Sequence, residues 1–112
     1  MILLSGILLS AFAYATYGDE IKPVKTEEFA DKGSSVKLSC TYSSANTLFW
    51  YRQYPGSAPQ YLVLIPEGTK DDWKSDVDKR FTARITKDKE KHVDLLLSSA
   101  AVSDSAVYYC AL

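Results

Sequence analysis

The two cysteines of this chain, Cys40 and Cys110, lie far apart and enclose a tryptophan, Trp50, soon after the first of them. Two cysteines allow a single intramolecular pairing. If the chain is exported, that disulfide persists in an oxidising compartment, and closing so long a loop stabilises the fold by about 4 kcal/mol on the chain-entropy model. A chain of 112 residues holds one domain at most, so this contribution can decide whether it folds.

The N-terminal segment has the features of a secretory signal peptide. Residues 2–13 are mostly apolar, no charge precedes Asp19, and the small residues Thr16 and Gly18 precede a candidate cleavage point after Gly18. The run is too short for a membrane-spanning helix, which needs about 20 residues. The absence of a Lys or Arg before it leaves an N-terminal strand or buried helix as the alternative. We expect residues 1–18 to be a signal peptide and residues 19–112 to be the domain.

Short alternating runs separated by turn residues predict an all-β domain after Asp19. Val36, Leu38 and Cys40 alternate with Lys37 and Ser39, as in a strand with one buried face. We expect about eight or nine short strands and no long amphipathic helix. The other expected strands cover residues 21–25, 48–54, 61–65, 81–85, 93–97 and 106–112.

These patterns resemble the variable domains of the immunoglobulin superfamily, most closely the alpha or delta chain of a T-cell receptor. The segments that carry the resemblance are Cys40, Phe49-Trp50-Tyr51-Arg52-Gln53, Pro55-Gly56, Arg80-Phe81 and Asp104-Ser105-Ala106-Val107-Tyr108-Tyr109-Cys110-Ala111-Leu112. The frame of two cysteines and a tryptophan is shared by many receptor domains, whereas the last segment together with Trp50-Tyr51-Arg52-Gln53 is far more specific.

The resemblance implies a two-sheet Greek-key sandwich with a structural core that needs no ligand. A disulfide between Cys40 and Cys110 would cross the core, with Trp50 packed on it. Tyr108 would turn its hydroxyl to the backbone near Asp104. The remaining expected structural residues are Leu97 on an inward strand face and an ion pair between Arg80 and Asp104.

In such a family, a complete variable domain continues through a third loop into a last strand with a Phe-Gly-x-Gly bulge, whereas this sequence ends at Leu112. An unrearranged germline segment has this form, because a separate joining segment supplies that strand. We therefore expect a V-type sandwich that lacks most or all of its final strand, with the backbone of residues 106–110 unpaired on one side. We also expect residues 19–112 by themselves to be marginally stable or prone to aggregation.

One strand face is unusually rich in tyrosine for a surface exposed to solvent. Alternation turns it away from Trp50 and Cys110, and tyrosine is enriched at interfaces. We predict that it docks a second variable domain and that Gln53 exchanges amide hydrogen bonds with its counterpart; the alternative is an ordinary exposed sheet face. The predicted interface residues are Tyr51, Gln53, Pro59, Tyr61 and Tyr109.

The resemblance also implies antigen-facing loops at one end of the sandwich. The first loop is built of residue types that adapt their hydrogen bonds, and the alternative for all of these segments is a plain connecting loop. The expected antigen-facing residues are Ser43, Ser44, Ala45, Asn46 and Thr47 in the first loop, Pro66, Glu67 and Gly68 in the second, and Ala111 and Leu112 at the junction.

Nothing in the sequence predicts catalysis. The single histidine, His92, lies in a charged segment, and a disulfide would consume both thiols. No zinc-ligand spacing occurs, and Asp71, Asp72, Asp76 and Asp78 lack the spacing of a calcium loop. A net charge of −1 gives no basic excess for nucleic acid. We expect no enzyme activity, no cofactor, no metal site and no nucleic-acid partner.

The function implied by the resemblance is antigen recognition at the cell surface. The domain would pair with a beta or gamma variable domain and bind a peptide on a histocompatibility molecule, or a ligand of the gamma-delta class. Membrane attachment would come only through downstream constant and transmembrane segments. The alternatives are an antibody light-chain variable segment and an innate or adhesion receptor that uses the same sandwich.

Overall fold

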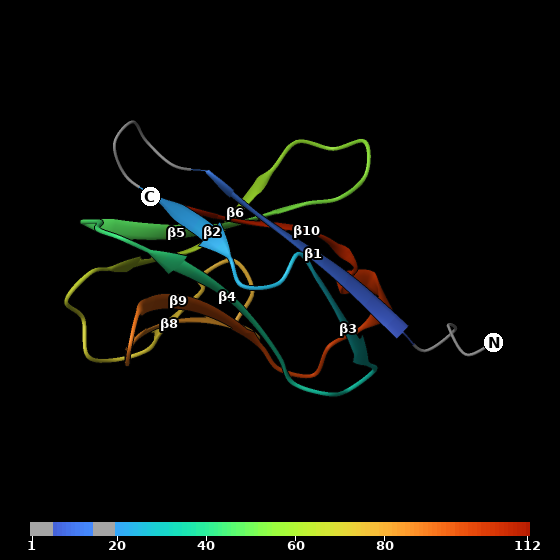
Figure 1. The fold of residues 1–112 in the computed structure, drawn as a ribbon. Helices are drawn as coiled ribbons and strands as arrows, with labels where there is room; N and C mark the ends of the chain where they lie inside the picture. Colours follow the sequence, from blue (N-terminus) through green and yellow to red (C-terminus); the bar gives the residue numbers. More distant parts are fainter. Residues whose placement is uncertain (1–5, 15–19) are drawn as a thin grey trace.

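Two five-stranded β-sheets lie face to face in the computed structural model, which describes residues 6–14 and 20–112 (Figure 1). The strands are β1 (Gly6–Tyr14), β2 (Ile21–Pro23), β3 (Glu27–Asp31), β4 (Val36–Tyr42), β5 (Thr47–Gln53), β6 (Gln60–Pro66), β7 (Trp73–Lys74), β8 (Phe81–Lys87), β9 (Lys91–Leu97) and β10 (Ala106–Ala111). One sheet has the order β3-β1-β10-β5-β6 and the other the order β2-β4-β9-β8-β7. The prediction of an all-β, two-sheet sandwich is confirmed.

The sheets pack face to face because alternate side chains on their strands are apolar and together form one core between them. In β4, Val36, Leu38 and Cys40 are buried and Lys37 is exposed. In β5, Leu48 and Trp50 are fully buried, and the residues between and beside them are partly exposed. Such burial removes apolar surface from water at about 25 cal/mol per Å², and it also fixes the register, because a slip of one residue would turn each apolar set to solvent.

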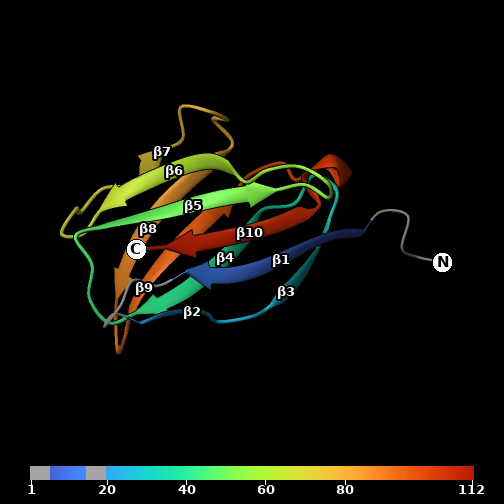
Figure 2. The same ribbon diagram turned by 90° about the horizontal axis from the view of Figure 1, so that it is seen from above.

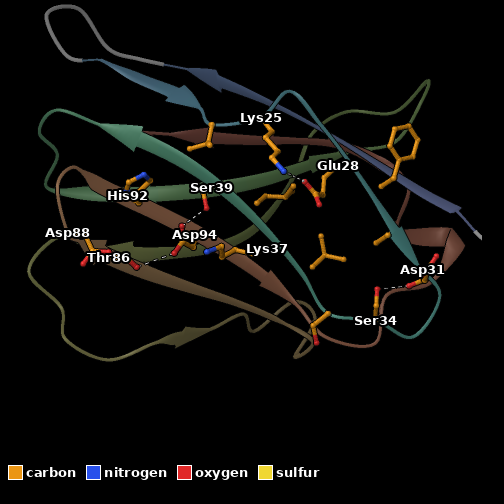
Figure 3. Close-up of a pocket in the computed structure, with 16 residues that line it drawn as sticks. Lys25, Glu28, Asp31, Ser34, Lys37, Ser39, Thr86, Asp88, His92 and Asp94 are labelled. Atoms are coloured by element: carbon orange, nitrogen blue, oxygen red, sulfur yellow. Dashed lines mark hydrogen bonds and ion pairs between the residues drawn. The ribbon is translucent and has the colours of Figure 1, made fainter.

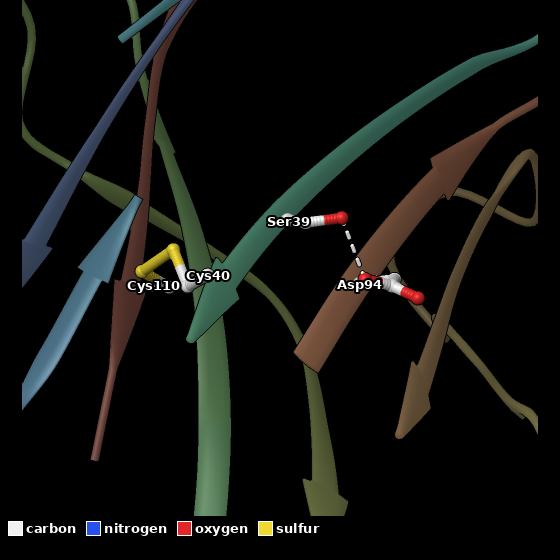
Figure 4. The surroundings of a disulfide bond; sticks show 4 residues. All are labelled: Ser39, Cys40, Asp94 and Cys110. Atoms are coloured by element: carbon white, nitrogen blue, oxygen red, sulfur yellow. Dashed lines mark hydrogen bonds between the residues drawn. A yellow bond between two sulfur atoms is a disulfide. The ribbon is translucent and has the colours of Figure 1, made fainter. Parts of the chain in front are cut away.

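The disulfide predicted from the two cysteines is present and joins the sheets. It links Cys40 on β4 to Cys110 on β10, over a sequence separation of 70 residues and a Cα–Cα distance of 6.7 Å. Trp50 on β5 is the register partner of Cys110 and has no exposed surface. Figure 4 shows that Ser39 projects to the opposite side of β4, toward Asp94, as strand alternation requires.

The expected open edge on residues 106–110 is wrong for the full chain, because β1 covers it. This strand runs parallel to β10, with pairs from Leu9 and Ala106 to Tyr14 and Ala111, and antiparallel to β3 (Figure 2). Leu9 is 1% exposed and belongs to the core. The physical reason is that an apolar extended segment both satisfies the backbone groups of the edge and fills the space beneath it. The candidate cleavage point after Gly18 lies outside the described residues.

The number of strands also differs from the expected eight or nine, since the described residues contain ten. Besides β1, the strands β3 and β7 were not predicted, and β3 belongs to the sheet of β1 and β10. The predicted strand over residues 21–25 is shortened to β2, which pairs with β4. Pro23 ends β2 at the sheet edge, where a residue without an N–H is tolerated. The crossing before β10 contains a short 3₁₀ helix, η2 (Val102–Asp104).

Candidate pairing face and recognition loops

The end of the sandwich that contains η2 is held by a charged network. The guanidinium of Arg80 donates hydrogen bonds of 2.9 Å to both carboxylate oxygens of Asp104 and a further one of 2.9 Å to Asp78. Asp104, only 2% exposed, also accepts from the backbone N–H of Ala101, and its carbonyl accepts the Tyr108 hydroxyl at 2.6 Å. The hydrogen bonds with Arg80 lower the pKa of Asp78 and raise that of Arg80 itself. The network ties η2 and β10 to the start of β8.

The predicted interface residues lie on the outward face of the sheet that contains β5, β6 and β10; we call Tyr51, Gln53, Pro59, Tyr61 and Tyr109 the pairing face. Tyr109, Tyr51 and Tyr61 are register partners on three adjacent strands and form a row. The rings of Tyr51 and Tyr61 meet edge to face at a centroid distance of 6.1 Å. Tyr61 is 40% exposed, and Pro59 is exposed in the turn before β6.

The amide of Gln53 already makes hydrogen bonds inside the chain. Its Oε1 accepts the Tyr109 hydroxyl at 2.7 Å, and its Nε2 donates to the carbonyl of Ser57 at 2.9 Å. A side-chain amide has two N–H groups and an oxygen with two lone pairs. Half of that capacity is therefore left for a partner, and the internal bonds hold the amide plane in a defined orientation.

The predicted antigen-facing segments meet at the end of the sandwich opposite to η2, together with the β8–β9 turn (Figure 2). Three of the residues assigned to loops are strand ends instead: Thr47 begins β5, Pro66 ends β6 and Ala111 ends β10. Each is an extended residue with a register partner in a neighbouring strand, Thr47 and Pro66 with each other. The first loop is thus shorter than predicted. The remaining predicted loop residues are Ser43, Ser44, Ala45 and Asn46, then Glu67 and Gly68, then Leu112.

Glu67 is not directed freely into solvent but toward the protein. Its carboxylate accepts a hydrogen bond from the Tyr42 hydroxyl at 3.0 Å and forms ion pairs with Lys87 at 3.2 Å and Lys91 at 3.8 Å. Its backbone N–H donates to the carbonyl of Asn46 at 2.9 Å. Burial acts to raise the pKa of Glu67, but the hydrogen bonds and the lysine charges outweigh it, so the pKa is lowered. Sequence reasoning missed these partners because they come from three separate strands.

The comparisons with known proteins agree with this geometry. The immunoglobulin V-set domain family matches residues 25–112. Human T cell receptor alpha variable 18 is 32% identical over 111 residues, which cover 96% of this chain and 94% of the relative. Human T cell receptor alpha variable 5 is 39% identical over 71% of this chain and 68% of its own length. Human T cell receptor beta variable 13 is 39% identical over 72% of this chain and 64% of its own length.

The chain belongs to the T-cell receptor variable domains of the immunoglobulin V-set family. Members of this family recognise ligands and are not enzymes. In the part of this T-cell receptor variable domain that the structure describes, no three or more His, Cys, Asp or Glu side chains are grouped so that they could hold a metal ion. No helix within residues 6–14 and 20–112 is both long and apolar enough to cross a membrane.

A groove of about 890 Å³ lies on the other sheet of this variable domain, between the β2–β3 crossing and the outer surface of β4 and β9 (Figure 3). Asp94 lies at its base and is 4% exposed, although alternation turns it outward. Its carboxylate accepts hydrogen bonds from Ser39 at 2.6 Å and Thr86 at 3.2 Å on the neighbouring strands. His92 lines the same groove, and its Nδ1 lies 3.2 Å from the carbonyl oxygen of Glu90.

Proposed function

We propose that this chain is the antigen-recognition variable domain of a T-cell receptor alpha or delta chain. The observation that carries the proposal is the match to an alpha variable segment over 96% of the chain. The tyrosine-rich face of this protein includes the exposed Tyr61 and the partly exposed Tyr51 and Tyr109. The domain pairs with a beta or gamma variable domain, and the pair recognises a peptide on a histocompatibility molecule or a ligand of the gamma-delta class.

The pairing face supports the first part of this proposal. A row of tyrosines across three strands offers apolar area and hydroxyl groups at low cost in side-chain entropy, which is the composition found at the centre of protein interfaces. Gln53 supplies an oriented amide beside this row, with one N–H and one lone pair left for the equivalent residue of a partner.

The loops support the second part, because they lie at one end of the sheet that carries the pairing face. Residues 43–46 and the segment after β6 are joined by the Glu67–Asn46 backbone hydrogen bond, and β10 ends beside them (Figure 2). A partner docked on the pairing face would bring its own loops to the same end. The combined surface could then cover a ligand larger than either domain alone could hold.

The N-terminal segment supports a place in the secretory pathway. We propose that residues 1–18 direct export and are removed, and that residues 19–112 then function outside the cell as part of a membrane receptor. The anchor would come from downstream constant and transmembrane segments. The Cys40–Cys110 disulfide fits this route, since disulfides persist in oxidising compartments.

A second candidate is a beta-type variable domain, and the 39% identity to human T cell receptor beta variable 13 favours it. The two candidates differ in the chain with which they pair. An alpha or delta domain pairs with beta or gamma, whereas a beta-type domain pairs with alpha. Co-expression with each type of chain therefore separates them.

The pairing experiment uses the chain completed with joining and constant segments and expressed with a beta chain or with an alpha chain. We expect surface display with the beta chain only. Tyr51→Lys together with Gln53→Lys should reduce this display at least tenfold, because two unpaired charges buried in the interface cost several kcal/mol. Thr41→Lys with Thr82→Lys, on the outer face of the other sheet, is the matched control and should leave display unchanged. Display that is insensitive to the Tyr51 and Gln53 changes would contradict the proposed face.

A further inference from the structure

The carboxylate of Glu67 links three segments at the end of the sandwich where the predicted antigen-facing loops meet. Glu67, in the turn after β6, contacts Tyr42 at the end of β4 and both Lys87 and Lys91 at the base of the β8–β9 turn. Through its backbone N–H it also holds Asn46 in the first loop. No other carboxylate in the described residues has ion pairs with two lysines that flank the same turn.

The surroundings of Glu67 separate it from an ordinary surface ion pair. Its side chain is 17% exposed, whereas those of Lys87 and Lys91 are 47% and 43% exposed. The Tyr42 ring beneath it is buried, and the ammonium of Lys91 lies 6.0 Å from the centre of that ring. The carboxylate is thus the part of the cluster most shielded from water, and the two lysines lie around it at the surface. Hydrogen bonds to a charged, partly buried acceptor are stronger than those between neutral groups.

We propose that Glu67 is a positioning residue that locks the first loop, the second loop and the β8–β9 turn into one recognition surface, instead of contacting the antigen itself. This role differs from the direct antigen contact that the sequence predicted for Glu67. The statement that this surface recognises antigen rests on the proposed function. The contacts by which Glu67 fixes the loops are present in the chain alone. Two consequences follow: the loops should loosen together when the carboxylate is neutralised, and the sandwich core should not.

The test is amide hydrogen exchange, measured by NMR on the full chain without ligand or partner. The substitution Glu67→Gln keeps the shape and a group that can accept from Tyr42, but removes the charge. We expect the amide of residue 67, which bonds to Asn46, to exchange about fivefold faster, as expected for the loss of a partly exposed ion pair. The amides of the turn residues 88–90 should also exchange faster, whereas those of Leu38 and Leu95 in the core should be unchanged.

Two further variants make the result specific. Glu90→Gln is the matched control, because it removes the same charge from an exposed carboxylate in the β8–β9 turn, and it should leave the exchange at residue 67 unchanged. Glu67→Lys should loosen the loops further, and adding Lys87→Glu should reverse most of that change by restoring an ion pair of opposite polarity.

The proposal is overturned if Glu67→Gln leaves the exchange at residue 67 within twofold of the original chain. It is also overturned if core and loop amides accelerate equally, since that pattern indicates general stability and not positioning, or if Lys87→Glu does not slow exchange in the Glu67→Lys background. Because the measurement involves no second chain, its outcome is independent of whether the pairing experiment succeeds.

Discussion

At the scale of single residues, burial decides which charged contacts contribute to stability. The Arg80 guanidinium spans two carboxylates, and one of them, Asp104, has a side chain only 2% exposed. Arg84 makes an ion pair of similar length with Asp72, but there the side chains are 47% and 42% exposed. Removing one member of a buried pair leaves an uncompensated charge, whereas exposed pairs contribute little because water screens them.

We therefore expect Asp104→Asn to lower the free energy of unfolding by about 1–3 kcal/mol, since it removes the charge of the best-shielded acceptor of Arg80, which keeps Asp78 as a partner. Asp72→Asn should lower it by less than about 1 kcal/mol. Urea unfolding of the full chain, with unchanged m-values, measures both. Similar losses for the two variants would show that the buried carboxylate has no special role in closing this end of the sandwich.

At the scale of elements, the most consequential strand is β1. It provides β3 with its connection to the sheet and covers β10 along six register pairs. Removal of residues 1–18, as proposed for export, would open this edge and leave a gap where Leu9 lay. The expectation that residues 19–112 are marginal or prone to aggregation is therefore kept for the processed chain, because exposed strand edges pair with other chains.

The docking of β1 can be tested in the uncleaved chain with two neighbouring substitutions. Leu9 is 1% exposed, so Leu9→Ala should lower the unfolding free energy by about 2–5 kcal/mol through lost burial and a cavity. Ser10 is partly exposed and serves as the control. Ser10→Ala should change the unfolding free energy by about 0.5 kcal/mol or less. Thermal or urea unfolding that finds both variants equal to the original chain would contradict the packing of β1 on the core.

At the scale of the whole molecule, the disulfide is the covalent constraint between the two sheets. It closes a loop of 70 residues in sequence, and Cys110 is the register partner of the buried Trp50. A link of this length restricts the unfolded chain strongly, so its contribution should be large relative to the stability of a small domain. The described residues contain no free cysteine.

Replacement of both cysteines, as Cys40→Ala with Cys110→Val, should lower the free energy of unfolding by about 4 kcal/mol and abolish folding if the domain is marginal. The measurement is urea unfolding compared with the oxidised original chain. Alkylation of the unreduced, secreted chain should modify neither sulfur. Two alkylated cysteines in that experiment would contradict the fold as described.

The sequence alone determined the fold class, the disulfide and the division of the β4 and β5 residues into inward and outward sets. These properties follow from a period of two, from two cysteines with one possible pairing, and from motifs local to short segments. The outward positions of Tyr51 and Tyr109 could be anticipated for the same reason. Tyr61 has the parity of the buried Val63 and Ile65, and only the register shift between β5 and β6 turns it outward.

Only the tertiary structure decided which segments meet. The partners of Glu67 come from β4, β8 and β9, and no periodicity relates them. Asp94 faces outward by alternation and is buried, because Ser39 and Thr86 lie on either side of it on neighbouring strands. The position of β1 depends on an open edge at β10, which the N-terminal segment cannot encode by itself. The local sequence pattern determines which side chains of a strand face inward or outward. Contacts between strands that are distant in sequence depend on how the two sheets assemble.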